Sequence, residues 1–262
     1  MILKHKVAVI FGAGGDIGSA VARAFAREGA RVFLSGRTLR KVEALAAEIV
    51  ERGGVAEAAQ VDALDEQAID EYVGAVAQKA GRLDISFNAI ALAQMAPKMP
   101  LVELSAEHFA LPITTYTLTN FLTARSVARH MVAKKSGVIL TITGTPGRMG
   151  FTNVGGTGPA YAGVVALTRN LSAELAPHGV RAVCLMPNAI PETTMIRNSF
   201  GHYAKAMGVT PAQFQSSVEN MTHLRRLTTL ADLSSVAAFL ASDLASGMTG
   251  TVVNLSGGGV VD

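Results

Sequence analysis

Residues 7–18 read VAVIFGAGGDIG, an apolar run that leads directly into a glycine-rich turn. The apolar run predicts a buried strand over 7–11, and the residues after the turn predict a helix. Glycines occupy positions 12, 14 and 18. Glycine permits a tight turn, lets a ligand phosphate approach the backbone, and allows close packing of helix on strand. The stretch therefore predicts a turn that binds the pyrophosphate of a dinucleotide.

The helix after this turn adds to the anion-binding prediction. It begins near Asp16, and its first turn directs free N–H groups and the positive end of the helix dipole toward the glycines. The spacing is GxGxxxG, one residue longer than the usual GxGxxG fingerprint, but the required strand and helix flank it. The expected cofactor contacts at the turn are Gly12, Gly14, Asp16, Ile17 and Gly18.

Length and composition indicate one large α/β domain over residues 1–262. The 262 residues are 49% apolar and 16% charged, which is enough for a sizeable core. The apolar stretches have strand length, so no membrane span is expected, and MILKHKVAV is too short to precede its strand as a secretory signal. A single cysteine, Cys184, excludes an internal disulfide framework. These features predict a cytoplasmic protein.

Charge and motifs exclude several function classes. The net charge is +3, and the Lys and Arg residues are scattered rather than gathered in a stripe with aromatics, so no nucleic-acid partner is expected. The six histidines share no metal-ligand spacing, so no metal site is expected. Neither a GxSxG elbow nor a GxxxxGK[ST] phosphate loop is present. A small-molecule substrate is the expected partner.

Strand and helix patterns alternate along nearly the whole chain. Strands are predicted at 7–11, 31–35, 55–61, 83–87, 138–142, 180–186 and 251–254. Helices are predicted at 16–29, from the Thr38 cap to Gly53, and at 65–80, 105–134, 157–177 and 230–241. Repeated strand–helix units with unbroken apolar strands predict a Rossmann fold, a doubly wound parallel sheet of about seven strands with helices on both faces.

The longest connection, residues 188–228, follows the sixth predicted strand. Ligands of such sheets bind beyond the carboxyl ends of the strands, so this segment would lie over the cofactor site. Its apolar and aromatic residues predict a substrate lid, and a subunit contact is the alternative.

The end of the second predicted strand bears on the choice of coenzyme. It reads Leu34-Ser35-Gly36-Arg37, without the carboxylate that would accept hydrogen bonds from an adenosine ribose. Arg37 is available to pair with a 2′-phosphate, which favours NADP(H) over NAD(H). The alternative is that Arg37 is an ordinary exposed loop residue.

Several further motifs resemble those of the short-chain dehydrogenase/reductase family over almost the full length. Besides the glycine turn, they are Val61-Asp62, Phe87-Asn88-Ala89-Ile90 where the family has Asn-Asn-Ala-Gly, Pro187-Asn188, and VNLSGG at 253–258. The resemblance implies that Asp62 contacts adenine and that Asn88 lines the adenosine pocket. It further implies that Pro187 and Thr193, or Thr194, lie at the pyrophosphate or the nicotinamide amide.

The same resemblance locates the family's catalytic Asn, Ser, Tyr and Lys. Two anchors, FLTAR at 121–125 and LTRNLSAEL at 167–175, fix the frame. The four positions then fall on Tyr116, Gly144, Thr157 and Tyr161, so all four differ from the family. Shifting the frame to make Tyr161 the catalytic tyrosine would put Val165 at the lysine and require an insertion.

A second branch, the enoyl-thioester reductases, offers a weaker likeness. Residues 90–93, IALA, and 114–117, TTYT, resemble two of its segments. The more widely spaced Tyr and Lys of that branch would fall on Val154 and Tyr161, so this pair is replaced as well.

The sequence therefore predicts an NADP(H)-dependent oxidoreductase with a non-standard site, in which Tyr116, Thr157 and Tyr161 take over proton transfer and substrate placement. A tyrosine without a neighbouring ammonium suits reduction of an activated C=C, C=N, quinone or carbonyl group. The alternatives are a cofactor-binding protein without turnover and a non-redox lyase or isomerase. Family resemblance also implies a homotetramer or homodimer, formed through the helices at 105–134 and 157–177.

Overall fold

The computed structural model describes residues 1–91 and 97–261. Its centre is a seven-stranded sheet in the order β3-β2-β1-β4-β5-β6-β7, and every neighbouring pair is parallel. The strands are β1 (Val7–Phe11), β2 (Arg31–Gly36), β3 (Val55–Gln60), β4 (Ile85–Asn88), β5 (Gly137–Ile142), β6 (Val180–Pro187) and β7 (Val252–Leu255). The strand order reverses between β1 and β4, and ligands of doubly wound sheets bind at such a point.

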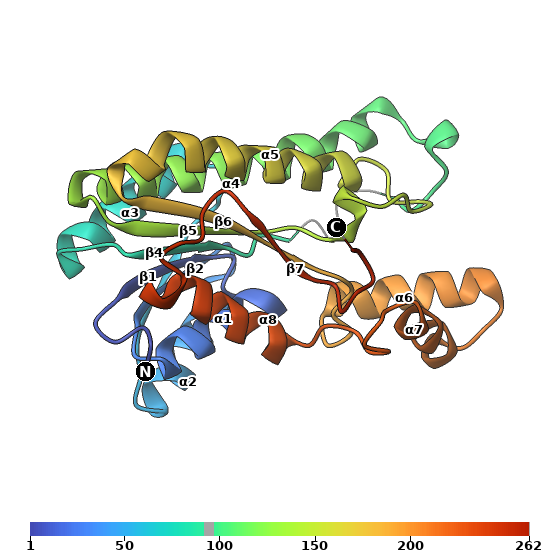
Figure 1. Ribbon diagram of the computed structural model, residues 1–262, viewed down its shortest axis with the longest axis horizontal. Helices are drawn as coiled ribbons and strands as arrows, with labels where there is room; N and C mark the ends of the chain where they lie inside the picture. The colour runs from blue at the N-terminus through green and yellow to red at the C-terminus, as the bar shows by residue number, and fades with distance from the viewer. Residues whose placement is uncertain (92–96, 262) are drawn as a thin grey trace.

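Helices cover both faces of this sheet (Figure 1). They are α1 (Asp16–Arg27), α2 (Leu39–Glu51), α3 (Glu66–Ala80), α4 (Ala106–Lys134), α5 (Thr157–Leu175), α6 (Thr194–Met207), α7 (Pro211–Asn220) and α8 (Leu230–Ala241). Helices α1, α2 and α8 lie on one face, and α3, α4 and α5 on the other. The predicted Rossmann architecture with about seven parallel strands is confirmed.

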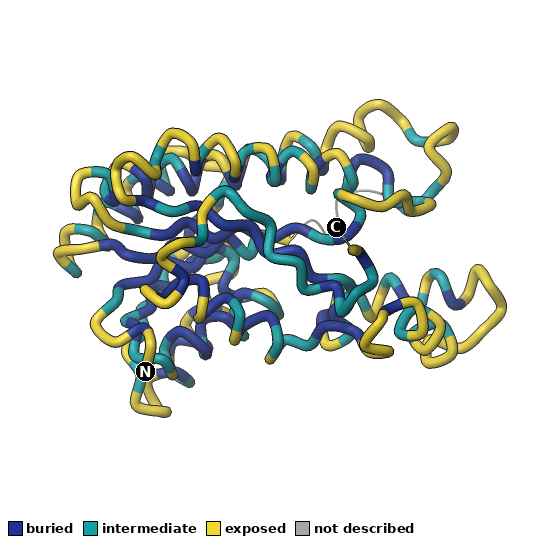
Figure 2. Tube along the Cα trace, in the orientation of Figure 1, coloured by how far each residue is buried: buried dark blue, intermediate teal, exposed yellow. Residues whose placement is uncertain are grey.

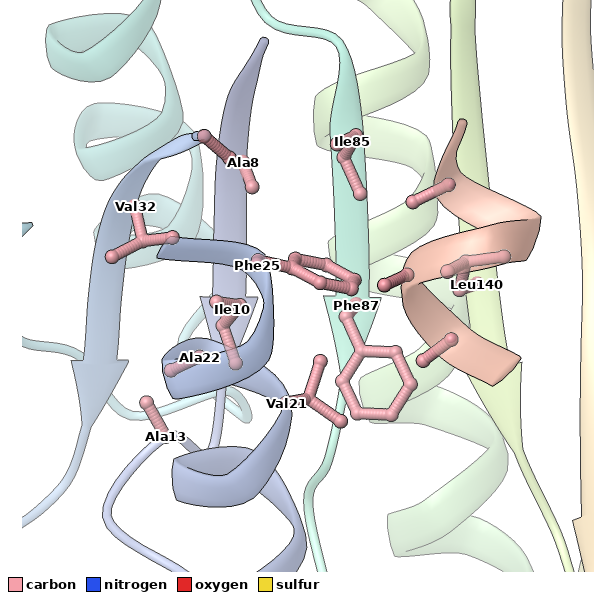
Figure 3. Close-up of a cluster of buried hydrophobic side chains, with 14 of the residues drawn as sticks. Ala8, Ile10, Ala13, Val21, Ala22, Phe25, Val32, Ile85, Phe87 and Leu140 are labelled. Atoms are coloured by element: carbon pink, nitrogen blue, oxygen red, sulfur yellow. The ribbon is translucent and has the colours of Figure 1, made fainter. Parts of the chain in front are cut away.

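A hydrophobic core lies on each face of the sheet, and alternate residues of each central strand point into one core or the other. On β1, Ala8 and Ile10 point toward α1, whereas Val9 and Phe11 point toward α3 and α4. The strands are accordingly buried on both sides (Figure 2), as expected for a parallel sheet between helical layers. In the α1 layer, Phe25 meets Phe87 edge to face at 6.5 Å between ring centroids (Figure 3).

The predicted long connection contains two helices, α6 and α7, that were not anticipated from its pattern. They pack chiefly against each other. Helix α6 buries two residues, Phe200 and Ala204, and α7 buries none, so neither presents the broad apolar stripe of a core helix. In the described part of the chain, no helix is long and apolar enough to cross a bilayer.

Candidate functional site

The turn after β1 can accommodate only glycine at two positions. Gly12 has φ +73°, and a Cβ there would lie 2.8 Å from the Ala89 carbonyl oxygen in the loop after β4. A Cβ on Gly18 would overlap the carbonyl oxygen of Gly12. The turn therefore packs tightly against the loop after β4 and against the first turn of α1.

The first turn of α1 is left open to a ligand. Its N-cap residue is Gly15, and no side chain of the described residues caps it. Three later helices have N-termini that are capped by threonine hydroxyls: Thr193 caps α6, Thr210 caps α7 and Thr229 caps α8. Uncapped N–H groups and the positive end of the dipole fit the pyrophosphate of a dinucleotide.

Asp16 stands at this turn, but its carboxylate contacts another helix. Its Oδ2 accepts a hydrogen bond from the backbone N–H of Thr194, the first residue of α6, at 2.7 Å. The adjacent Thr193 is buried, and its hydroxyl donates to Ile190 O at 2.8 Å and accepts from Ile196 N at 3.3 Å. The predicted cofactor residues Asp16 and Thr193 therefore lie close together at the start of α6. The side chain of each already forms hydrogen bonds within the protein.

A group of cations follows β2. Arg37, Arg40 and Lys41 are exposed, and none forms an ion pair within residues 1–91 and 97–261. Gln60 Nε2 donates to the Arg37 carbonyl at 3.0 Å and so fixes the loop. Lys41 also approaches the turn, because a Cβ on Gly14 would lie 3.2 Å from Lys41 Cβ. A phosphate on the adenosine ribose would be matched by these cations.

The remaining predicted adenosine contacts, Asp62 and Asn88, differ in how far their side-chain polar atoms are already hydrogen-bonded within the protein. Asp62 is exposed, and its Oδ1 accepts from Leu64 N at 3.1 Å, which leaves Oδ2 for a ligand. Asn88 is buried and donates to Thr119 O and Thr123 Oγ1 at 3.3 and 2.9 Å, while its Oδ1 accepts from Ile90 N at 3.0 Å. The Asn88 side chain therefore joins β4 to α4.

The structure brings three of the four predicted tetrad positions into contact. The rings of Tyr116 and Tyr161 meet edge to face at 5.5 Å and 64°. A Cβ on Gly144 would lie 3.0 Å from Tyr161 Cε2, so the Tyr161 ring lies directly against the Gly144 backbone. Thr157 begins α5, one turn before Tyr161 on the same helix.

The two phenols have different environments. Tyr116 is buried, its hydroxyl donates to the Ile142 carbonyl, and burial raises its pKa well above the ordinary value, with further contributions from Tyr161 and Cys184. Tyr161 is half-buried, and desolvation raises its pKa to about 12. Both are neutral at physiological pH, and only Tyr116 has its proton committed to the backbone. A catalytic role for Tyr116 stays a prediction. Its hydroxyl proton is already donated to the Ile142 carbonyl, which does not favour that role.

The ends of the predicted lid, 188–228, are joined to each other. Asn188 Oδ1 accepts from Thr228 N at 3.1 Å and from Thr228 Oγ1 at 2.9 Å, directly after the buried Pro187. Between these ends, α6 and α7 pack through Phe200 on Phe214, with centroids 5.3 Å apart. The segment therefore leaves the end of β6 and returns to the start of α8 at one point.

Tyr203 of α6 connects this helical pair to two loops at the sheet edge. Its hydroxyl donates to Thr152 O at 3.2 Å, after β5. Lys98, after β4, places Nζ 4.9 Å from the Tyr203 ring centroid, and burial lowers the pKa of Lys98. Lys98 was not anticipated from the sequence, since no motif surrounds it. Of the 90–93 stretch, residues 92 and 93 lie outside the described residues.

Within the described ranges, no group of three or more His, Cys, Asp or Glu side chains is placed to hold a metal ion. The candidate site thus combines a glycine turn before an uncapped helix N-terminus, a cationic loop and a pair of tyrosines.

Comparison with known proteins agrees with this geometry. The family model described as "Enoyl-(Acyl carrier protein) reductase" matches residues 12–259. The chain belongs to the short-chain dehydrogenase/reductase family. It is accordingly an NAD(P)-dependent oxidoreductase of that family.

Individual relatives cover the whole domain of this short-chain dehydrogenase/reductase. The uncharacterized oxidoreductase YxjF of Bacillus subtilis is 30% identical over 257 residues, 98% of each chain. Sorbitol-6-phosphate 2-dehydrogenase SrlD from Erwinia amylovora has a TM-score of 0.91 at 28% identity, covering 97% of this chain and 100% of that one.

Two other solved structures differ in coenzyme. NAD+-bound xylitol dehydrogenase has a TM-score of 0.91 at 26% identity and covers 98% of this chain and 100% of its own. An actinorhodin polyketide ketoreductase with NADPH has a TM-score of 0.88 at 25% identity, covering 97% of each chain. Overall fold is therefore compatible with either coenzyme, and the choice depends on local residues.

Proposed function

We propose that the protein is an NADP(H)-dependent reductase of a small organic substrate that carries an activated C=C, C=N, quinone or carbonyl group. The observation that carries this proposal is the Tyr161 phenol, which lies against Gly144 with its pKa raised to about 12. At neutral pH this group is protonated, so it can donate a proton to a strongly basic anion but has no phenolate form to accept one. Helix α5 contains no lysine that would lower its pKa. The arrangement therefore suits reduction better than alcohol oxidation.

The preference for NADP(H) is supported by the loop after β2. Arg37, Arg40 and Lys41 are exposed there without ion-pair partners among the described residues, and no carboxylate ends the strand. A ribose 2′-phosphate would gain charge-assisted hydrogen bonds from Arg37, whereas a 2′-hydroxyl would find no acceptor at this strand end. Gly12, Gly14, Asp16, Ile17 and Gly18 would border the pyrophosphate, and Asp62, Asn88, Pro187 and Thr193 the rest of the dinucleotide.

The chain's own residues would manage placement and protons. The bound nicotinamide would supply a hydride to the substrate. The Tyr161 hydroxyl would donate a proton to the anion that hydride addition creates, and water would then reprotonate the phenolate. The Thr157 hydroxyl, one turn away on α5, would orient the same substrate atom. Tyr116 would brace the Tyr161 ring from behind through their edge-to-face contact.

The segment 188–228 is proposed as the substrate lid, because its ends are joined at Asn188–Thr228 and Tyr203 reaches the loops after β4 and β5. We also propose a homodimer or homotetramer that buries the outer faces of α4 and α5. Exposed apolar side chains on α4 support this, namely Phe109, Leu111, Leu118 and Phe121. The lone buried Cys184 suits a reducing cytoplasm.

The test is NADPH consumption by purified protein with panels of activated alkenes, imines, quinones and ketones. We expect turnover with at least one panel. Tyr161→Phe should then lower kcat by roughly 10²- to 10⁴-fold, while NADPH affinity stays the same, because only the donated proton is lost. Tyr72→Phe is the matched control, since Tyr72 lies in α3 and packs on Phe11.

Three outcomes would contradict the proposal. Tight NADPH binding without consumption on any panel would indicate a binding protein without turnover. Substrate conversion without net NADPH use would indicate a lyase or isomerase. Equal kcat for Tyr161→Phe and the parent protein would remove Tyr161 from proton transfer.

A further inference from the structure

We propose that Asp16 is a positioning residue that fastens helix α6 to the coenzyme-binding turn, so that coenzyme binding and the position of the α6–α7 pair influence each other. This inference rests on the proposed coenzyme site at the start of α1. It differs from a direct cofactor contact, because the carboxylate acts through α6.

The geometry places one carboxylate between two helix N-termini. Asp16 is the first residue of α1, and its Oδ2 accepts from the N–H of Thr194, the first residue of α6, at 2.7 Å. The side chain of Thr193 already accepts from Ile196 N, so Asp16 binds a different free donor of the same helix end. The positive ends of both helix dipoles stabilise the carboxylate in this position.

Few contacts other than this one hold α6 and α7 to the rest of the molecule. The two helices pack on each other through Phe200, Tyr203 and Phe214, and they project to one side of the sheet in Figure 1. In residues 1–91 and 97–261, the polar contacts from these helices to the chain outside 188–228 are Asp16–Thr194, Tyr203–Thr152 and Lys98–Tyr203. Elements with so few anchors open at low free-energy cost, and loss of one anchor has a large effect.

The same carboxylate lies at the turn that would bind the dinucleotide pyrophosphate. Its negative charge opposes an incoming phosphate, whereas its bond to Thr194 holds α6 beside the site. Asp16 therefore makes two opposite contributions to coenzyme affinity. By linkage, any change that this bond makes in coenzyme affinity is matched by an equal effect of coenzyme on the bond.

Two variants separate the charge from the hydrogen bond. Asp16→Asn keeps an oxygen acceptor for Thr194 N–H but removes the charge, and Asp16→Ala removes both. NADPH affinity is measured by calorimetry, and amide hydrogen exchange is measured over residues 194–207 with and without NADPH. Thermal unfolding of each variant verifies that it is folded.

We expect Asp16→Asn to bind NADPH roughly threefold more tightly than the parent protein, with exchange of α6 unchanged. We expect Asp16→Ala to bind NADPH more weakly than Asp16→Asn and to exchange α6 amides at least tenfold faster. In the parent protein, NADPH should slow α6 exchange. Asp65→Ala is the control, because Asp65 Oδ1 accepts from Ala68 N at 3.0 Å at the start of α3, another helix N-terminus. Its NADPH affinity should stay within twofold of the parent.

Unchanged α6 exchange in Asp16→Ala would overturn the fastening role, and this result is independent of coenzyme. Equal NADPH affinity of the two Asp16 variants would overturn the coupling. Absence of NADPH and NADH binding in the parent protein would overturn both the coupling and the proposed coenzyme site. The exchange measurement would still decide whether Asp16 holds α6.

Discussion

At Gly144, the absence of a side chain admits the ring of Tyr161. The would-be Cβ position lies 3.0 Å from Tyr161 Cε2, and the ring also meets Tyr116 at 5.5 Å. The residues that the resemblance assigns to the tetrad's Asn, Ser and Lys thus fit each other as a set. A half-buried phenol and a buried phenol occupy the region, and the Tyr116 hydroxyl satisfies the Ile142 carbonyl.

A double-mutant cycle of Gly144 and Tyr161 tests this fit. Gly144→Ala should lower the free energy of unfolding by about 1–3 kcal/mol, because the new methyl group displaces the Tyr161 ring. In a Tyr161→Ala background the same substitution should have little effect, since the ring is gone. Chemical denaturation of the four proteins gives the coupling energy. Additive effects would show that Gly144 and Tyr161 do not share this space.

Tyr116 should matter more to stability than to chemistry. Tyr116→Phe leaves the buried Ile142 carbonyl without its donor, so the free energy of unfolding should fall by about 1–3 kcal/mol. Urea denaturation measures the loss. A variant as stable as the parent would mean that the hydroxyl makes no net contribution, and the structural role assigned to it would be wrong.

The raised pKa of Tyr161 predicts the pH dependence of reduction. The donor must be protonated, and a phenol with its pKa raised to about 12 stays protonated below that pH. Its protonated fraction is therefore constant from about pH 6 to 9, and activity due to this group falls only as the pH approaches its pKa. Plots of kcat against pH for the parent protein and for Tyr161→Phe should therefore have the same shape between about pH 6 and 9. An inflection near neutrality that disappears in Tyr161→Phe would contradict the assignment.

At the scale of elements, the sequence pattern predicted those whose stability comes from a broad buried face or a strong cap. Helix α4 was predicted at 105–134 and spans Ala106–Lys134, with Ser105 accepting from His108 N at its start. Helices α6 and α7 were not predicted, because their apolar residues serve mainly their mutual contact. A usable signal was nevertheless present for α7, whose Thr210 and Gln213 form a capping box.

The site was predictable only in part for a related reason. The glycine turn is a local pattern, so its glycines together with the flanking strand and helix located it, and the position of Arg37 followed from the end of β2. Asn88 instead reaches Thr119 and Thr123 on α4, and Asp16 reaches Thr194, 178 residues away in the chain. Such contacts depend on the packed fold, and no local spacing encodes them.

At the scale of the whole molecule, the parallel sheet gathers these loops at one edge. The turn after β1, the cations after β2, Asn88 at the end of β4, Gly144 after β5 and Pro187 at the end of β6 all lie at the carboxyl ends of strands. Helices on both faces fix the strands rigidly, whereas the α6–α7 pair is attached by few contacts. In the proposed function, the strand ends would form the coenzyme platform and the segment 188–228 the lid beside it.

Parallel calorimetric titrations with NADPH and NADH test the proposed preference for NADP(H). We expect NADPH to bind at least tenfold more tightly than NADH. Arg37→Ala should weaken NADPH binding by roughly 10- to 100-fold and leave NADH binding unchanged, because the guanidinium meets only the 2′-phosphate. Arg27→Ala, exposed at the far end of α1, is the matched control and should bind both coenzymes like the parent protein. No heat with either coenzyme, or tighter binding of NADH, would contradict the account.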